Sequence, residues 1–535
     1  MFSKIINYSQ DHPFVSLGLC FIWIFLFQSL NIFWGFELVD SGYHLTAFDN
    51  IFDAPDSVSG NFPLYLTNLV GGIIMKLFPN IGIVGFRFLG AFFVDCSILL
   101  VFICLRKEIP VIHLLIGSIL IVMNYIQIPY SFNNGICSCF FYVCALLALY
   151  RGLVSDKIML VLLSGFFIGI NIFSRIPNVL AIGLTFVTMF HSYIDSKILR
   201  YDWESSFFFL LGIIAGVGII LLIIISLGHQ KTFIDALNGL LFIGKTSGDG
   251  HSFGNLIWTQ IYFYLNAIMF ASLFFAISFV YSRVGNILLR LLFISLASLV
   301  IFYHVYLNIG YEPLWSICAM GCCVCLVNGR VSPLLALFAV FMLLFEIMGS
   351  GGGNNHGSLP ALLAAPVASY VLLNKKNIIF VIVACMALFM RVIKQGNYFD
   401  FGPLSSKKFF INTGECSLIR TTEERAEAIN ATLPALKKYI HPKDTLLVYD
   451  SAPMMNYLTH TRPAGGVCWP AVASYIKPFE SAPKILIQRF NDFSEPAIQT
   501  YGIPTNNQMI NAYMKEHQYH IVWENPYFIL LFPQK

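Results

Sequence analysis

Apolar runs recur along the first three quarters of this chain, and they restrict its possible folds more than any other feature. The runs lie between residues 14 and 394, and most are 15 to 25 residues long. A helix needs roughly 17 to 25 residues to cross a bilayer, and fewer where neighbouring helices cover its ends. Only 11% of the residues are charged, whereas about a quarter are charged in an ordinary soluble domain. The sequence therefore predicts a polytopic α-helical membrane protein.

The apolar runs predict about thirteen transmembrane helices. They cover residues 14–33, 81–105, 110–128, 136–150, 158–174, 178–193, 206–228, 259–281, 287–308, 313–327, 332–349, 358–373 and 378–394. The first run is too long for the apolar core of a signal peptide, and no small-residue cleavage site follows it. We therefore interpret it as an uncleaved first span.

Basic residues predict the orientation, because Lys and Arg collect in the cytoplasmic loops of membrane proteins. With a cytoplasmic N-terminus, the inside loops hold Arg106, Lys107, Arg151, Lys157, Lys197, Arg200, Arg283, Arg330, Lys375 and Lys376. The outside then receives the loops at 34–80, 129–135, 175–178, 229–258, 309–312 and 350–357, and everything after about 395. The apolar stretch 63–78 is separated from the next run by only three residues, so we predict a helix along the outer membrane surface.

The last 140 residues differ from the rest, because charged residues and prolines return there. The segment 421–440 carries Glu423 and Glu424 in its first turn and predicts an amphipathic helix. Short apolar runs at 445–450, 484–490 and 527–532 predict buried strands. We therefore divide the chain into a transmembrane part, 1–394, and a small extracytoplasmic α/β domain, 395–535.

The net charge and the cysteines exclude some classes of function. A net charge of only +4 gives no basic footprint for nucleic acid. Most of the 13 cysteines lie inside apolar runs, where they are expected to pack as small apolar residues, and neither their spacing nor their flanking polarity indicates a zinc site. Cys416 and Cys468 lie outside the membrane part and could pair in an oxidising compartment.

The first outer loop is rich in acids and has no Lys or Arg between residues 34 and 56. Asp49, Asp53 and Asp56 would share one face of a helix, which favours a solvated acidic surface. Asp40 follows the end of the first span, where a carboxylate is costly unless it is used or paired. We therefore interpret Asp40 as the catalytic or substrate-orienting carboxylate. The side chains predicted to shape a pocket beside it are Tyr43 and His44.

Two arginines near the outer ends of predicted spans are candidates for substrate binding. Arg87 either faces a partner or cavity or extends to the membrane interface. Arg175 and Asn178 lie in a very short outer turn, with Pro177 suited to the first turn of the next helix. An arginine fixed at a helix start can bind a phosphate with two parallel hydrogen bonds. The alternative for Arg175 is a simple anchor of the helix end.

A glycine-rich segment and a long outer loop complete the candidates. GSGGGNNHGSLP (349–360) can present backbone N–H groups to an anion, and it lacks the Lys-Ser/Thr of a P-loop. Its polar side chains are Asn354, Asn355 and His356. The loop 229–258 carries His251 among flexible glycines and is either a mobile substrate loop or an ordinary long loop.

These segments resemble the GT-C superfamily of membrane glycosyltransferases. DSGYHL (40–45) resembles the family's Asp-Glu and Tyr region, and NFPLY (61–65) resembles its HPPLY segment. LFPNIGIVGFRFLGAFF (77–93) is similar to the segment that enters the second span, with Arg87 at the family's arginine. The nearest group contains the protein mannosyltransferases and lipid A aminoarabinose transferases. SRIPN and GSGGGNNHG are similar to segments of Bacteroidetes-type members.

The resemblance is clearest over residues 34–93, and the chain departs from the family pattern at two positions. Ser41 replaces the second acid of the Asp-Glu pair, and Asn61 replaces the histidine of HPPLY. A possible divalent metal is therefore left open, as is the use of Asp49 or Asp53 as the second carboxylate.

The resemblance implies transfer of a sugar, hexose or pentose, from a polyprenyl-phosphate-linked donor to a glycan, lipid or protein acceptor. The reaction would take place at the outer face of a bacterial inner membrane, with the C-terminal domain in the periplasm. Asp40 would act as general base, while Arg175 and the 349–357 loop would stabilise the departing lipid phosphate. The residues expected to contact substrate are Tyr43, His44, Asn61, Arg87, Arg175, Asn178, His251, Asn354, Asn355 and His356.

Two other classes of function compete with a transferase of this kind. A transporter or flippase of lipid-linked glycans predicts ionisable residues near mid-span and paired broken helices. Asp95 and Glu346 are its main candidates, and no internal repeat is visible. A polysaccharide polymerase or ligase would use the same donor class but usually lacks a terminal domain the size of 395–535.

Overall fold

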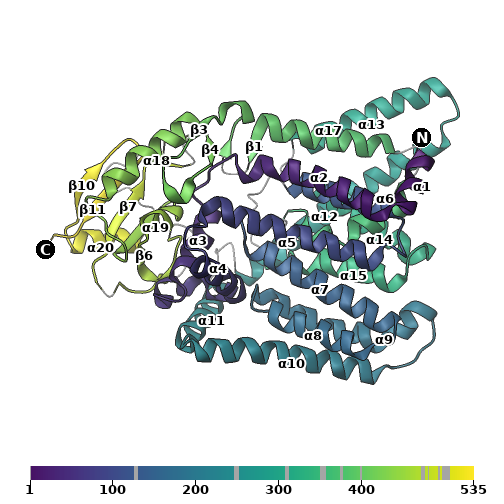
Figure 1. The fold of residues 1–535 in the computed structure, drawn as a ribbon, viewed down its shortest axis with the longest axis horizontal. Coiled ribbons are helices and arrows are strands. Elements are labelled where there is room, and N and C mark those ends of the chain that lie inside the picture. Colours follow the sequence, from purple (N-terminus) through teal and green to yellow (C-terminus); the bar gives the residue numbers. More distant parts are fainter. Residues whose placement is uncertain are drawn as a thin grey trace.

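In this computed structural model, a bundle of long helices carries a mixed α/β region at one end (Figure 1). The structure describes residues 2–125, 131–245, 252–307, 312–349, 357–373, 378–397, 400–470, 476–479, 481–491, 495–496 and 507–534. The N-terminal helix α1 (Phe2–Asp11) lies at the end of the bundle away from the sheet, and the C-terminus lies beyond the sheet (Figure 1). The two termini are therefore at opposite ends of the molecule.

Each apolar run that predicted a span coincides with a helix. These helices are α2 (Pro13–Ile32), α5 (Gly82–Leu105), α6 (Val111–Tyr125), α7 (Asn134–Val154), α8 (Ile158–Asn171), α9 (Leu184–Ser196), α10 (Trp203–Ser226), α12 (Phe253–Arg283), α13 (Ile287–Leu307), α14 (Glu312–Asn328), α15 (Pro333–Phe345), α16 (Ala364–Leu372) and α17 (Ile378–Gln395). Short 3-10 turns, η2 (Ile176–Gly183) and η3 (Leu359–Ala361), precede α9 and α16.

Length and composition alone qualify five helical segments of the described chain to cross a membrane. They are Pro13–Ile32, Gly82–Leu105, Asn134–Val154, Ile176–Ser196 and Trp203–Ser226. Shorter apolar helices make up much of the rest of the bundle. The chain thus has several helices suited to a bilayer, and the figure of about thirteen spans stays a prediction.

Helices α8 and α10 show how small residues allow close packing in the bundle. Gly165 and Gly169 of α8 lie against Gly212 and Gly216 of α10, and a Cβ at any of these positions would meet backbone atoms of the other helix. Apolar surface gives little drive for association inside a bilayer, so close backbone approach through small residues supplies the packing energy.

The predicted first outer loop, 34–80, is largely helical. It contains α3 (Asp40–Asn50), the 3-10 segment η1 (Pro55–Leu64) and α4 (Tyr65–Leu77). Helices α3 and α4 lie between the bundle and the sheet region (Figure 1). The apolar stretch 63–78 forms α4 and the end of η1, as expected of a helix there.

The prediction of a long loop over residues 229–258 is wrong for much of that range. Residues Gln230–Lys245 form a helix, α11, and α12 begins at Phe253. Thr232, Phe233 and Ala236 are buried on one face of α11, and this helix packs against η1. The apolar residues of 230–245 thus follow a helical period, which the glycines and charges of this segment concealed.

A five-stranded sheet forms the centre of the C-terminal region. Its strands are β5 (Thr445–Tyr449), β6 (Arg462–Pro463), β7 (Lys484–Gln488), β10 (His520–Glu524) and β11 (Phe528–Phe532), in the order β10-β11-β7-β5-β6. Strand β5 runs parallel to β6 and β7, and the other pairings are antiparallel. The three predicted strands coincide with β5, β7 and β11, and the predicted helix 421–440 coincides with α18 (Glu423–Leu436).

Smaller elements complete the C-terminal region. They are the hairpins β1 (Gly396–Asn397) with β2 (Asp400–Phe401), β3 (Phe409–Phe410) with β4 (Arg420–Thr421), and β8 (Phe490–Asn491) with β9 (Glu495–Pro496), the turn η5 (Gly414–Cys416), and the helices α19 (Met454–Thr459) and α20 (Gln508–Glu516).

The sheet shares one hydrophobic core with the helices of the bundle. Val448 and Leu486 face this common core, whereas Leu447 and Ile485 face a smaller cluster that includes Ile510 of α20. Alternate residues of each strand point to opposite faces, so the two sets fall on the two sides of the sheet. The C-terminal region is therefore packed firmly against the outer loop and the bundle.

Candidate active site

Glu37 caps the helix that Asp40 begins. Its side chain is only 2% exposed, and its carboxylate accepts hydrogen bonds from the backbone N–H groups of Val39 and Ser41, both at 2.5 Å. The first N–H groups of a helix have no partner within it, and a negative charge there complements the helix dipole. Glu37 therefore fixes the start of α3, and with it the backbone of Asp40.

Asp40 combines access to solvent with an unusual pKa. Its side chain is exposed, whereas the residues from Gly35 to Val39 and from Ser41 to Gly42 are buried. Loss of hydration among the surrounding protein atoms, and then the charge of Glu37, raises the pKa of Asp40 from 3.8 to about 7. Exposure and a raised pKa occur together when water reaches a side chain from one side and protein surrounds it on the others. A carboxyl of this pKa can exchange a proton near neutral pH, as a general base must.

Tyr43 and His44 follow Asp40 on α3 and differ in state. Burial lowers the pKa of His44 to about 4, so its imidazole is neutral at pH 7. The half-buried Tyr43 is within electrostatic reach of Asp40 and Cys468, and burial raises the pKa of its phenol well above the ordinary value. Tyr43 therefore keeps its O–H and can donate a hydrogen bond beside Asp40.

Asn61 links α3 to the C-terminal region. It is fully buried, its Nδ2 donates to the carbonyl of Tyr43 at 3.4 Å, and its Oδ1 accepts from Sγ of Cys468 at 3.3 Å. Both ends of the amide are thus engaged by protein, and the contact with substrate that we predict for Asn61 stays a prediction.

The other acids of the first outer loop have partners of their own. Asp49 lies 3.6 Å from Nδ1 of His460, and Asp53 pairs with Lys76 at 3.1 Å on the open surface. Asp56 accepts a hydrogen bond from Thr232 of α11. The structure therefore gives Asp49 and Asp53 packing or surface roles, and their use as a second catalytic carboxylate stays a prediction.

Arg87 is buried against the end of the first span. Its Nη1 donates to the carbonyls of Asn31 and Ile32 at 3.0 and 3.2 Å, and its Nη2 donates to the carbonyl of Gly35 at 2.8 Å. The last carbonyls of a helix lack partners within it, so a cation there stabilises the helix end. These contacts account for both terminal nitrogens of Arg87 without a substrate.

Arg175 forms a buried ion pair with Glu346. The two side chains are 4% and 0% exposed, and Nη1 lies 3.1 Å from Oε1 of Glu346. Arg175 also donates to the backbone carbonyls of Glu346 and of Met348, the latter at 3.0 Å. Gly349 packs against Pro177, where a Cβ would clash. The structure thus brings together the beginning of the glycine-rich segment and the SRIPN turn.

Asn178 holds the same turn from within the bundle. Its Nδ2 donates to Oγ of Ser138 at 3.0 Å and to the carbonyl of Asn171 at 2.9 Å. It is 1% exposed, so its present contacts are those of a residue that fastens η2 to α7 and α8. Its predicted contact with substrate stays a prediction.

Tyr125, the last residue of α6, connects the two halves of the candidate site. It is within electrostatic reach of both Asp40 and Glu346. The accessible carboxylate of α3 and the buried Arg175–Glu346 pair therefore both lie toward the Tyr125 end of α6. His251, Asn354, Asn355 and His356, which the sequence also predicts for this site, lie outside the residues that the structure describes.

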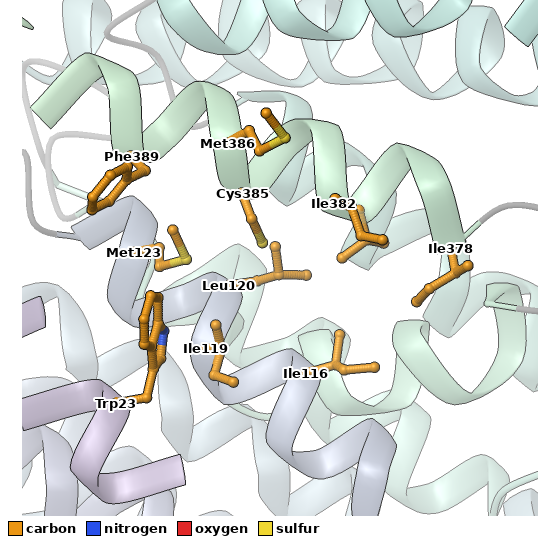
Figure 2. A pocket seen from close by; sticks show the side chains of 11 residues that line it. Trp23, Ile116, Ile119, Leu120, Met123, Ile378, Ile382, Cys385, Met386 and Phe389 are labelled. Carbon is orange, nitrogen blue, oxygen red and sulfur yellow. The ribbon is translucent and has the colours of Figure 1, made fainter. Parts of the chain in front are cut away.

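An apolar cavity of ≈ 480 Å³ lies among α2, α6 and α17 (Figure 2). Its walls are aliphatic, aromatic and sulfur-containing side chains, among them Trp23, Met123 and Phe389. Met123 lies two positions before Tyr125 on α6. The helix that lines the cavity therefore ends in the neighbourhood of Asp40.

In the part of the chain that the structure describes, the side chains near Asp40 do not form a set of metal ligands. Both carboxylate oxygens of Glu37 accept backbone hydrogen bonds, so Glu37 and Asp40 are not a free pair of ligands. No group of three His, Cys, Asp or Glu side chains that could hold a metal occurs among the described residues. Cys416 and Cys468 are both buried and both free, so the disulfide allowed by the sequence is not formed.

The contacts of two residues in this region were not predicted from the sequence. Glu37 is one of five acids between residues 34 and 56, and an acid just before a helix start is a signal for capping. Glu346 pairs with Arg175, and its use by a transporter stays a prediction. Two opposite charges at the ends of apolar runs were a signal for such a pair, because unpaired charges are costly there.

No protein-family model and no curated protein matches this sequence. Among solved structures, the chain is similar to an Archaeoglobus fulgidus oligosaccharyltransferase in complex with Zn and sulfate, at 11% identity and a TM-score of 0.42. That alignment covers 84% of this chain and 64% of the other, so the chain spans just under two thirds of the oligosaccharyltransferase's length.

Two further solved structures are similar. ArnT from Cupriavidus metallidurans, bound to undecaprenyl phosphate, aligns over 96% of this chain and 97% of its own at 11% identity, with a TM-score of 0.44. The A. fulgidus oligosaccharyltransferase AglB, in complex with an inhibitory peptide and a dolichol-phosphate, aligns over 89% and 70% at 14% identity, with a TM-score of 0.43. These similarities identify no side chain, substrate or membrane face of this chain.

Proposed function

We propose that this protein is an integral-membrane glycosyltransferase that moves a sugar from a polyprenyl-phosphate-linked donor to a glycan, lipid or protein acceptor. The observation that carries the proposal is Asp40, an accessible carboxylate at the start of α3 whose pKa is raised to about 7 by lost hydration and by the charge of Glu37. A base of this kind suits removal of a proton from an acceptor hydroxyl near neutral pH. The reaction takes place at the outer face of a bacterial inner membrane.

The proposed reaction is a displacement at the anomeric carbon of the donor sugar. Asp40 accepts the proton of the acceptor hydroxyl while the acceptor oxygen bonds to the anomeric carbon. The bond from that carbon to the phosphate oxygen breaks, and the lipid phosphate leaves with the electron pair. Tyr43 retains its O–H because burial raises its pKa, and it is placed to orient a sugar hydroxyl.

Arg175 is our candidate for stabilising the departing phosphate. In the free protein its guanidinium is engaged by Glu346 and two backbone carbonyls. A phosphate would therefore bind by replacing part of this set. The apolar cavity among α2, α6 and α17 suits a prenyl chain, since its walls offer apolar side chains (Figure 2).

The test is transfer of sugar from a synthetic prenyl-phospho-sugar, measured for wild type and for Asp40→Asn purified in detergent. We expect Asp40→Asn to lose on the order of 10²- to 10⁴-fold in kcat, the usual contribution of a general base. Asp156→Asn is the matched control, because Asp156 is an exposed acid in a loop predicted to face the cytoplasm. Near-wild-type turnover by folded Asp40→Asn would remove Asp40 from the mechanism.

The acceptor and sugar are best found in vivo. Mass spectrometry of lipid-linked and envelope glycans from a deletion strain would show a missing sugar for a transferase. Accumulation of a complete lipid-linked glycan at the inner face would instead indicate a flippase. Shortened polymers would indicate a polymerase or ligase.

A further inference from the structure

The backbone that leads into Asp40 is held mainly by the C-terminal region. Arg420 donates its N–H to the carbonyl of Phe33 at 2.9 Å, and its carbonyl accepts from the N–H of Gly35 at 2.8 Å. The N–H of Phe36 donates to Oδ2 of Asp400 at 2.6 Å. These groups lie close to 400 residues apart in sequence, so only the folded C-terminal region can supply the contacts.

Asp400 is the centre of a buried charged cluster. It is 1% exposed and lies 3.5 Å from Nζ of Lys407 and 3.5 Å from Nε of Arg425. Its Oδ2 also accepts from Oγ1 of Thr421 at 3.1 Å. Arg425 in turn donates to the carbonyl of Phe36 at 2.8 Å. Both polar groups of the Phe36 backbone are thus bound by this one cluster.

Helix α19 continues the same support along α3. The N–H of Met454 donates to the carbonyl of Leu38 at 2.9 Å, and Oγ1 of Thr46 donates to the carbonyl of Pro453 at 3.1 Å. A Cβ on Gly42 would meet the backbone of Met454. The first turns of α3 therefore lie directly on α19 with no space between them.

His460 fixes the far end of α3. It lies between the carboxylates of Asp49 and Glu415, at 3.6 and 3.2 Å. These two partners raise the pKa of His460 to about 10, so it is cationic at neutral pH. Contacts from the C-terminal region therefore occur before Asp40, beside it and beyond it.

We propose that the segments 400–425 and 453–460 are a positioning element for Asp40, and that Asp400 is the central positioning residue because its carboxylate fixes the backbone at Phe36. This inference rests on the proposed function of Asp40. Phe36 directly precedes Glu37, whose carboxylate caps α3, so a displacement of Phe36 moves the cap and Asp40 together. The C-terminal region thus takes part in catalysis through the first outer loop, without a contact to substrate.

The experiment compares two charge-balanced double variants. Asp400→Ala with Lys407→Met removes the acceptor for the Phe36 N–H together with one buried cation. Asp400→Asn with Lys407→Met keeps a side-chain oxygen in place for that N–H. A misplacement of about 1 Å costs on the order of 10²-fold in rate. We therefore expect the first variant to lose on the order of 10²-fold in kcat, with an unchanged KM for a prenyl-phospho-sugar, and the second to stay within about tenfold of wild type.

The pH profile of kcat separates positioning from simple destabilisation. The charge of Glu37 contributes to the raised pKa of Asp40. The inflection of the kcat profile should therefore move away from pH 7 in the Ala/Met variant, which releases Phe36. It should stay near pH 7 in the Asn/Met variant, which keeps an acceptor for the Phe36 N–H. Asp444→Asn is the control, since the Asp444–Lys484 pair at 2.6 Å lies within the C-terminal region and touches neither Phe36 nor α3. This control should lower thermal stability without moving the inflection.

Failure of this inference differs from failure of the proposed function. If Asp40→Asn is inactive while the Ala/Met variant keeps wild-type kcat and inflection, Asp400 is not a positioning residue. If Asp40→Asn is itself active, the proposed function is contradicted first.

A second variant serves if the Ala/Met variant does not fold. Thr421→Val removes one hydrogen bond to Asp400 and conserves volume. It should then lower kcat modestly, and an unchanged kcat and inflection would overturn the inference.

Discussion

At the scale of single residues, Glu37 and Asp40 show how two neighbouring acids acquire different roles. Both oxygens of Glu37 are bound by backbone N–H groups, so this carboxylate serves the helix. Asp40 is left open to solvent with a pKa raised to about 7 by lost hydration and by Glu37. The carboxylate that caps the helix therefore helps to set the pKa of Asp40, the proposed general base.

The raised pKa of Asp40 has a consequence for stability that is opposite to its consequence for activity. The folded state binds the proton more tightly than the unfolded chain, so the contribution of Asp40 to stability is present below about pH 4 and is lost as pH rises to about 7. We expect Asp40→Asn to be more thermostable than wild type at pH 8 and equal to it near pH 4. Unfolding in detergent at both pH values checks this, and a variant less stable than wild type at pH 8 would contradict it.

The same pKa predicts the pH dependence of activity. Wild-type kcat should fall about tenfold per pH unit below 7.

The Arg175–Glu346 and Lys76–Asp53 pairs differ in what they contribute. The first is almost wholly buried and the second is 56% and 62% exposed. Removing one partner of a buried pair leaves an uncompensated charge and costs roughly 3–5 kcal/mol, whereas a surface pair contributes about 0–1 kcal/mol. Glu346→Gln should therefore lower the unfolding midpoint in detergent far more than Asp53→Asn. Equal effects would show that Arg175 finds another partner.

At the scale of elements, α3 is defined by the surfaces around it more than by its own sequence. Its first turn is capped by Glu37, its glycine meets α19, and its last turn carries Asp49 beside His460. The other outer elements follow the same principle, since α11 packs on η1. Helices α3 and α19, and likewise α11 and η1, therefore support one another by direct packing.

Gly42 is the position on α3 where packing leaves no freedom. A Cβ there would meet the N, Cα and Cβ atoms of Met454, so Gly42→Ala must separate α3 from α19. We expect a large loss of transfer activity and a lower unfolding midpoint. The matched control is Gly18→Ala in α2, where a Cβ meets nothing within 4 Å and the lower chain entropy stabilises the helix by roughly 0.5–1 kcal/mol. Full activity of Gly42→Ala would contradict the close contact with α19.

At the scale of the whole molecule, the two termini lie at opposite ends of a helical bundle (Figure 1). The sheet and α3 are both at the end away from the N-terminus (Figure 1). This arrangement suits a protein whose chemistry takes place at one membrane face, with a C-terminal region that supports the site there.

The predicted orientation can be tested with reporter fusions. Alkaline phosphatase fused after Lys535 should be active, because the C-terminal region is predicted to lie in the periplasm, and green fluorescent protein at the same point should be dark. Fusions truncated at Lys157, in a loop predicted to face the cytoplasm, should give the reverse result. An inactive phosphatase at Lys535 would place the proposed site on the wrong face for this reaction.

Much of the helical framework could be predicted because the requirements for a span are local. An apolar run of sufficient length specifies a helix wherever it lies, and each of the predicted runs coincides with one. The strands β5, β7 and β11 were predicted for a similar reason, as short apolar runs between turn residues. Helix α11 was missed because its apolar face is narrow and interrupted by glycines.

The candidate site was predictable only in part. Asp40 could be singled out because a carboxylate at the end of a span is costly, and that cost is visible locally. The partners of the charged residues could not be predicted, since Arg175 meets Glu346 across 171 residues and Asp400 meets Phe36 across 364. By itself, the sequence determined most of the long helices and the acid that begins α3. Only the tertiary structure decided which charged side chains form buried pairs and that Asp40 stays accessible to solvent, because pairing between distant segments depends on how the whole chain packs.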